Sequence, residues 1–571
     1  MEELDTGIVG SKLRIDKLAV IIAIVLLGLL VALTIGFPQQ VPEALDSARA
    51  SVLRVVGFYL MLIVIVALIF NIYLAFSKYG AIKMSKEKPE YSVFSWIAMI
   101  FCAAMGTSIL YWSAIEWVMY AIWTPFTMEA AAPEGMAEAA MRTTAGYDIT
   151  EMAVGYSFFH WGIPAWSIYA VGVVPLAYRY YVRKKEDLSL QVGCEGVLGD
   201  RVNGWLGRVI NIIFIFGILG GLVISYGTGV PMLANNLRNI FGGPEAMEGF
   251  MAYAILVGVI TVTFATSTYM GLKKGMQQVS RFTTWGSILL CVLFLVLVSP
   301  LFIVNNFVQS IGVMISQFVP MSFYLDPIHS TGFPQDWTCF YWAWWIGLAP
   351  WMWIFIAKIS RGRTIRSIIL TTTLAGTAGS LVFFGTISNY GLGQYVQGGF
   401  NAVQSYIDGG YVVNPVISDL VLSLPGGNII LIIWFLVAFF LLVTTMDSAS
   451  YTLAAASTLG MKASDDPSKN TRLFWAVMLC VAPLSLMYSG SKIAEASGGI
   501  IPSIQLGGLQ AMLIFTALPV SVLMFFVMKS GMKWLKEDYG FKTKDEIIRE
   551  YMDDEDLAKY KAQREGAGLV A

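Results

Sequence analysis

The strongest constraint on the fold is the repetition of long apolar stretches separated by short polar connections. Stretches of roughly 20 apolar residues are long enough to cross a bilayer as helices, and only 13% of the 571 residues are charged. The sequence therefore predicts an all-α membrane protein with about twelve transmembrane helices. The predicted spans are residues 18–37, 52–76, 93–122, 150–178, 206–236, 249–270, 282–304, 338–357, 367–388, 428–459, 473–489 and 502–528.

Lysine and arginine gather in every second connection. Basic clusters precede the first span and follow the second, fourth, sixth, eighth, tenth and twelfth spans, whereas connections 305–335 and 389–427 contain no lysine or arginine. Basic residues are retained on the cytoplasmic side of membranes. The pattern predicts a multi-pass protein of the plasma (inner) membrane with both termini in the cytoplasm, including an N-terminal tail at 1–17 and a C-terminal tail at 529–571.

Two outer connections carry helical periodicity of their own. Apolar residues recur at helical intervals in 306–321 and 411–424, which predicts amphipathic helices lying along the membrane surface. The tail segment 545–563 has mixed charge and is also predicted to form a helix. Two interpretations of that tail stay open, a solvated helix or a regulatory element that contacts lipid or a partner.

Several functional classes are disfavoured by composition. The net charge of -1 gives no indication of a nucleic-acid partner. The five cysteines show no paired spacing, and two histidines are too few for a metalloenzyme that needs several histidine ligands. We expect a protein that is not an enzyme and has no organic cofactor.

The third span contains small and hydroxyl residues in the middle of an apolar run. Met105 is followed by Gly106, Thr107 and Ser108. Such residues allow close packing of membrane helices. They are also typical of the broken helices of secondary transporters, where freed carbonyl groups and half-helix ends meet ions and substrate. The sequence alone leaves both interpretations open.

The tenth span is interrupted by a second polar group. A carboxylate such as Asp447 is costly within a membrane, so we expect a functional or network role for it. Thr444 and Thr445 offer neutral oxygen atoms of the kind that suits a releasable sodium ion. Together with backbone oxygens of Met105 and Gly106, they predict a sodium site. Cys102, one turn before the glycine, is included in that predicted site.

Aromatic residues gather on two spans. Residues 337–366 contain six tryptophans, and Tyr341, Trp345, Leu348 and Met352 share one helical face while Trp344 and Trp351 occupy the neighbouring stripe. The fourth span adds Trp161, Trp166 and Tyr169. An interfacial belt is one explanation. The distance of these residues from the span ends, at ~1.5 Å per residue, favours an aromatic cage for a quaternary ammonium group instead.

These motifs resemble the betaine/carnitine/choline transporter family. The resemblance is carried by AMGTSILYWSAIEW at 104–117, FHWGIPAWSIYA at 159–170, GLKKGMQQVSR at 271–281 and the run from Asp336 to Arg366. It implies a leucine-transporter-like five-plus-five inverted repeat, with repeats at 93–304 and 336–528. It also implies two extra N-terminal helices at 18–76 and a homotrimer.

The resemblance also implies roles for individual residues. The cage positions are Trp161, Trp166, Tyr169 and Trp345, with Trp344 beside them. Leu348 stands where the family has a further aromatic residue, which opens space on that face. Substrate carboxylates would meet backbone donors at Gly106, Thr107 and Ser108.

Ion coupling is indicated by a further set of positions. Gln277 occupies the position at which the family's sodium-independent antiporter has an arginine, and both Thr444 and Thr445 are kept, which favours sodium coupling. Met352 matches a methionine of the antiporter, and Cys102, Ala104, Thr107 and Ser108 depart from the glycine-rich pattern of the betaine symporters. The residues predicted to take part in coupling are Gln277, Trp351, Met352 and Asp447.

The function predicted from these observations is secondary active transport. The expected cargo is a quaternary ammonium solute of the betaine, choline or carnitine type, or a related sulfonium solute, moved by sodium symport. The alternative is sodium-independent antiport of the carnitine/butyrobetaine type. A membrane enzyme or a transporter-like receptor is less consistent with the two histidines and the absence of a large soluble domain.

Overall fold

The chain folds almost entirely into helices. The computed structural model describes residues 14–122, 149–270, 273–327, 331–462, 465–496 and 504–551. The helices of the first half are α1 (Lys17–Gly36), α2 (Gln40–Phe76), α3 (Val93–Ala104), α4 (Ser108–Ile122), α6 (Ile149–His160), α7 (Ile163–Val171), α8 (Val173–Ala177), α9 (Leu190–Gly193), α10 (Glu195–Leu198), α11 (Trp205–Phe241), α12 (Phe250–Met270) and α13 (Lys273–Val296).

The second half continues in the same way. Its helices are α14 (Pro300–Ser316), α15 (Phe318–Phe323), α16 (Cys339–Lys358), α17 (Ile365–Leu370), α18 (Gly376–Phe383), α19 (Asn389–Val396), α20 (Ala402–Asp408), α21 (Val413–Leu422), α22 (Gly427–Ala456), α23 (Lys469–Ala496), α24 (Ile504–Tyr539) and α25 (Lys544–Glu550). Short turns of other helix types are η1 (Lys78–Ala81), η2 (Tyr178–Val182), η3 (Gly199–Asn203), η4 (Glu245–Glu248), η5 (Pro334–Thr338), η6 (Thr371–Ala375) and η7 (Phe384–Ser388).

The helices match the predicted membrane spans. Among the described residues, ten continuous helical segments are long and apolar enough to cross a bilayer, and the bent pair α3 and α4 makes an eleventh. The remaining predicted span, 249–270, corresponds to α12, whose apolar part Phe250–Thr266 is shorter. The prediction of an all-α multi-pass membrane protein is confirmed.

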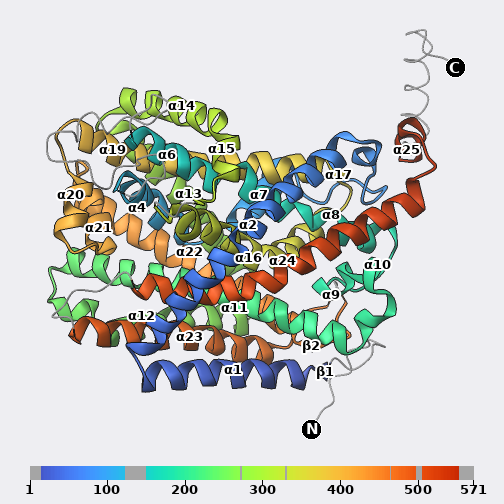
Figure 1. The fold of residues 1–571 in the computed structure, drawn as a ribbon, viewed down its shortest axis with the longest axis horizontal. Coiled ribbons are helices and arrows are strands. Elements are labelled where there is room, and N and C mark those ends of the chain that lie inside the picture. The colour runs from blue at the N-terminus through green and yellow to red at the C-terminus, as the bar shows by residue number, and fades with distance from the viewer. Residues whose placement is uncertain are drawn as a thin grey trace.

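The span helices run roughly side by side, so their connections collect at two opposite ends of the molecule (Figure 1). Helices α20 and α21 lie at one end, on the left of the view, and α9, α10 and α25 lie at the other. The strand β1 (Arg14–Ile15), which precedes α1, is at the same end as α25. The first and last helical spans therefore begin and end on the same side. The cytoplasmic assignment of that side stays a prediction.

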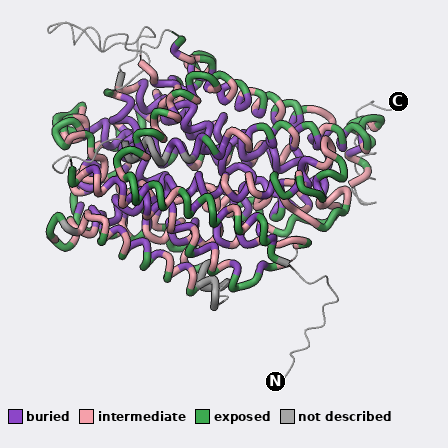
Figure 2. Tube along the Cα trace, turned by 60° about the horizontal axis from the view of Figure 1, so that its bottom comes forward, coloured by how far each residue is buried: buried purple, intermediate pink, exposed green. Residues whose placement is uncertain are grey.

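The most buried spans are those that carry the aromatic residues. The segment Thr150–Val182, which runs from α6 to η2, is 94% buried over its most apolar window, and Pro334–Lys358, which contains α16, is 89% buried. The corresponding value for α1 is 22%. Figure 2 shows the buried chain inside a surface of exposed and intermediate residues. The two aromatic spans form the centre of the bundle.

The basic segment after α16 also makes structural contacts, in addition to its predicted role in setting the orientation of the chain in the membrane. The Arg363 side chain donates a hydrogen bond to the Tyr91 carbonyl at 2.6 Å and lies over the Trp96 ring at 4.5 Å. Arg366 donates to the Ala75 carbonyl at 2.8 Å, and Arg361 pairs with Glu87 at 3.0 Å. The segment therefore joins the α16–α17 connection to the α2–α3 connection.

A two-stranded ribbon joins the chain start to the end of α22. Strand β1 pairs antiparallel with β2 (Thr458–Leu459). The Asp16 backbone N–H donates to the Ser457 carbonyl at 2.8 Å, and the Asp16 side chain caps α1 by accepting from the Ala19 N–H. The long helix α22 is thereby connected to the first span.

Some segment boundaries differ from the sequence prediction. The seventh span ends at Val296 rather than near residue 304, because a new helix, α14, begins at Pro300, a residue suited to the first helical turn. The two predicted surface segments are helical, as α14, α15 and α21. Connection 123–148 and tail residues 552–571 lie outside the described residues. The inverted repeat and the homotrimer stay predictions.

The close packing around Gly172 predicts that a larger residue at this position lowers the stability of the protein. A Cβ atom added at Gly172 would lie 2.1 Å from Cδ2 of Trp353, whereas one added at Gly258 would meet nothing within 4 Å. We expect Gly172→Ala to lower the free energy of unfolding by about 1–3 kcal/mol because of overpacking. Gly258→Ala, in the interior of α12, should leave it unchanged or raise it by up to about 1 kcal/mol, because alanine favours the helix and meets free space. Denaturant unfolding of the purified protein measures both, and equal effects would contradict the packing at Gly172.

Candidate functional site

The third span is broken, as one of the two sequence interpretations expected. Helix α3 ends at Ala104 and α4 begins at Ser108, with a bend of 67° between them. The Thr107 hydroxyl donates a 2.7 Å hydrogen bond to the Ala438 carbonyl of α22, and Thr107 is fully buried. The break is thereby attached to α22, the helix that carries the threonine pair.

Gly106 lies directly against Thr445, one member of the threonine pair. A Cβ atom at Gly106 would be 2.9 Å from Oγ1 of Thr445, so only glycine allows this approach. Oγ1 of Thr445 donates to the Leu441 carbonyl at 2.9 Å, and Thr444 donates within its own helix in the same way. Because each hydroxyl donates its hydrogen to the helix, its oxygen lone pairs stay available to a cation.

Further residues were predicted either to bind the ion or to couple it to transport. The Cys102 thiol contacts the Thr284 hydroxyl of α13 at 3.3 Å, so its sodium role stays a prediction without structural support. Asp447 is half-buried on α22. Gln277 lies in α13, but its side chain is outside those described.

The aromatic residues picked out by sequence form one cluster. The Trp345 ring contacts those of Trp161 and Trp166 at centroid distances of 5.7 Å and that of Tyr169 at 4.7 Å. Trp161 also contacts Trp344 at 5.8 Å. All five side chains are buried. Residues nearly 180 positions apart in the sequence therefore meet at the centre of the bundle, which excludes an interfacial belt for this cluster.

The orientation of the rings is set by indole hydrogen bonds. Trp166 donates to the Ser380 hydroxyl at 3.1 Å, and Trp344 donates to the Gly221 carbonyl at 3.2 Å. The indole N–H of Trp345 is buried and has no hydrogen-bond partner among the described residues. Among the described residues, the Trp345 ring is thus held by packing.

Leu348 faces a neighbouring helix at close range. A Cβ atom at Gly221 of α11 would lie 2.5 Å from Cδ2 of Leu348, so the leucine side chain fills the space above this glycine. Trp351 and Met352 are buried further along α16. Their predicted roles in cargo size and coupling stay predictions.

A buried carboxylate beside the aromatic cluster was missed at the sequence level. Glu116 of α4 is fully buried, and its Oε2 accepts a 2.9 Å hydrogen bond from the Trp161 indole and another from the Tyr341 hydroxyl. Nearby, the His160 ring bonds to Tyr120 at 2.8 Å and to Thr338 at 3.0 Å. The signal was present, because Glu116 is the one charged residue of the apolar run 108–122.

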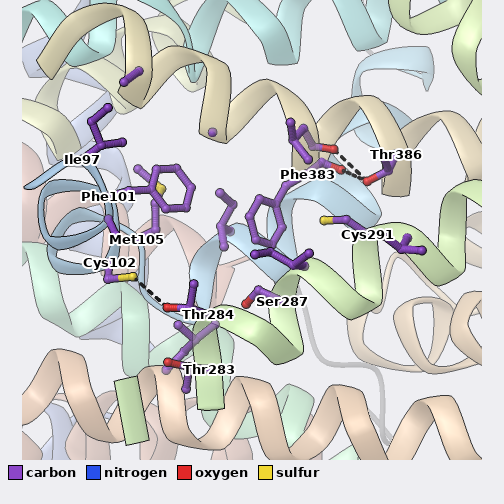
Figure 3. Close-up of a pocket in the computed structure, with 18 of the residues that line it drawn as sticks. Ile97, Phe101, Cys102, Met105, Thr283, Thr284, Ser287, Cys291, Phe383 and Thr386 are labelled. Carbon is purple, nitrogen blue, oxygen red and sulfur yellow. Dashed lines mark hydrogen bonds between the residues drawn. The ribbon is translucent and has the colours of Figure 1, made fainter. Parts of the chain in front are cut away.

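A cavity of about 420 Å³ lies on the other side of the broken helix (Figure 3). Phe101 separates it from the cage, since its ring stacks on Trp166 at 6.0 Å. The cavity is bounded by α3, α13, α18, η7 and α22. Its hydroxyl groups at Thr283, Thr284 and Thr386 donate to carbonyls of their own helices. Ser287 adds another hydroxyl group and Cys102 a thiol, and the rest of the lining is apolar, so this cavity does not provide the chemistry of a cage for a charged solute.

The sequence matches known transporters along most of its length. Residues 18–540 match the family described as BCCT, betaine/carnitine/choline family transporter. A carnitine transporter of Acinetobacter baumannii is 34% identical, over 89% of this chain and 86% of its own length. A glycine betaine transporter of Bacillus subtilis is 31% identical, over 86% and 89%. An osmo-independent choline transporter of Acinetobacter baylyi is 29% identical, over 90% and 92%.

The attachment of the break to α22 gives a second stability prediction. Thr107→Val keeps the side-chain shape but leaves the buried Ala438 carbonyl without its side-chain donor, which should lower the free energy of unfolding by about 1–3 kcal/mol. Thr228→Val is the matched control, since that buried hydroxyl bonds only to the Ile224 carbonyl of its own helix. Denaturant unfolding should show the larger loss for Thr107→Val. Equal losses would mean that the break does not depend on this bond.

Proposed function

Because the chain belongs to the betaine/carnitine/choline transporter family, we propose that it is a secondary active transporter of quaternary ammonium solutes or related sulfonium solutes. The observation that carries the proposal is the buried ring cluster of Trp161, Trp166, Tyr169 and Trp345. Aromatic faces attract cations that cannot donate hydrogen bonds, and trimethylammonium groups are recognised in this way.

The broken helix gives the cage a polar neighbour. Backbone groups at Gly106, Thr107 and Ser108 begin α4, and the N-terminal end of a helix favours an anion. A zwitterionic solute would place its ammonium head among the rings and its carboxylate toward this helix start. A cationic solute such as choline would use the rings alone.

We propose sodium as the coupling ion. Support comes from the approach of Gly106 to Thr445 and from the hydroxyl oxygens of Thr444 and Thr445, which are neutral hard donors on adjacent residues of α22. Sodium held between α22 and the break would stabilise one arrangement of these two elements. Cargo bound in the cage would then be carried as access to the site alternates. The homotrimer and the inner-membrane location are further parts of this proposal.

The cage is tested by removal of its central ring. Trp345→Ala should raise the apparent substrate constant at least about tenfold, because the cation loses a desolvated aromatic face. The control is Trp285→Ala, since Trp285 is 67% exposed on α13. The measurement is uptake into proteoliposomes of glycine betaine, choline, carnitine, ectoine and dimethylsulfoniopropionate. Unchanged transport by Trp345→Ala would contradict the cage.

The coupling ion is tested by removal of both hydroxyls. Thr444→Ala/Thr445→Ala should abolish stimulation of uptake by an inward sodium gradient. Thr263→Ala, at an exposed hydroxyl that also bonds within its helix, should leave the stimulation intact. Sodium-independent uptake by the wild type would contradict symport. Uptake that requires liposomes preloaded with a second solute would identify the protein as an antiporter.

A further inference from the structure

Glu116 carries an ionisable carboxyl group in a place where a charge is costly. It lies within the membrane-spanning helix α4 with no exposed surface. Among the described residues, the groups that interact with its carboxyl are neutral, namely the side chains of Tyr341, Trp161, Ser157 and Tyr120. Neutral donors satisfy hydrogen bonds but do not balance a negative charge. A buried carboxylate in a membrane is expected to have a partner of opposite charge.

The carboxylate lies directly behind the cage wall. Its Oε2 accepts from the Trp161 indole and from the Tyr341 hydroxyl, and the rings of these two residues contact each other at 5.7 Å. The Trp161 ring in turn contacts Trp345 at 5.7 Å. One aromatic ring, that of Trp161, therefore lies between the carboxylate and Trp345.

We infer that Glu116 provides the negative charge that balances the cationic head of the cargo, acting through Trp161. This inference rests on the proposed function, because it requires an ammonium or sulfonium group in the cage. Two physical effects act in the same direction. The carboxylate attracts the cation through a weakly screening interior, and an indole N–H that donates to an anion makes its ring more electron-rich, which strengthens the cation–π contact.

A purely structural role makes a different prediction. As a hydrogen-bond acceptor alone, Glu116 would orient Trp161 and Tyr341 without contributing charge. Glutamine keeps an acceptor oxygen at the same reach and removes the charge, so Glu116→Gln separates the two roles. Tyr341→Phe removes one hydrogen bond to the carboxylate and keeps the charge in place.

The test is a cycle that removes charge from the protein and from the ligand in turn. The two ligands are choline and its uncharged carbon analogue 3,3-dimethyl-1-butanol, which share shape and hydroxyl group. Dissociation constants are measured on the purified protein by tryptophan fluorescence. At an effective dielectric constant of ~20, one charge acting across a ring predicts a contribution on the order of ten- to fifty-fold in affinity.

We expect wild type to prefer choline strongly and Glu116→Gln to reduce that preference by about tenfold or more. Tyr341→Phe and the surface control Asp408→Asn should keep the wild-type preference. If Glu116→Gln fails to fold, Glu116→Met repeats the measurement with another neutral side chain of similar length.

The outcomes separate this inference from the proposed function. One outcome is that the wild type prefers choline and Glu116→Gln shows the same preference for choline as the wild type. This result overturns the charge role and leaves the cage intact. A wild type that binds both ligands equally, or neither, overturns the cage and the charge role together. Loss of affinity for both ligands in equal proportion shows that Glu116 only positions the rings, which also overturns the inference.

Discussion

The structure depends on how polar groups are satisfied where the third span is broken. A membrane offers no water to an interrupted helix, so an interruption is tolerated only where protein provides the partners. Here the Thr107 hydroxyl reaches the Ala438 carbonyl, and Gly106 lets α22 approach until the Thr445 hydroxyl touches the break. The contacts that stabilise the break also bring together oxygen atoms that are proposed to bind sodium. The contacts that stabilise the break and the proposed sodium site therefore share one set of residues.

The central aromatic cluster is arranged by the same principle. Buried indole N–H groups usually have a hydrogen-bond partner. Trp166 and Trp344 find partners on α18 and α11, namely the Ser380 hydroxyl and the Gly221 carbonyl. These bonds fix the rings from outside the cluster. The inner faces are consequently left to contact one another, with Trp345 in the middle.

Much of this could be predicted from the sequence, because membrane helices follow simple rules of length and polarity. Residue types and periodicity predicted the spans and the aromatic stripes on two of them. The break at Gly106 was one of two open interpretations, and the meeting of Trp161, Trp166 and Tyr169 with Trp345 was implied by the family resemblance. Glu116 was not predicted, because a single acid in an apolar run says nothing about which rings its oxygens reach. The thiol of Cys102 contacts the Thr284 hydroxyl, and its role in the sodium site stays a prediction.

The two proposed cation sites differ in charge, and this difference has a physical reason. Thr444 and Thr445 contribute only neutral oxygens, which bind a small ion through dipoles and can release it when the geometry changes. A quaternary ammonium head is too large for such close coordination by single oxygen atoms. In the proposed site, aromatic rings surround the head, and Glu116 provides the opposite charge from behind one ring without contacting it. A carboxylate in direct contact would demand desolvation of both charges on every transport cycle. The Trp161 indole between them keeps the attraction while the carboxylate stays hydrogen-bonded, whether the cage is full or empty.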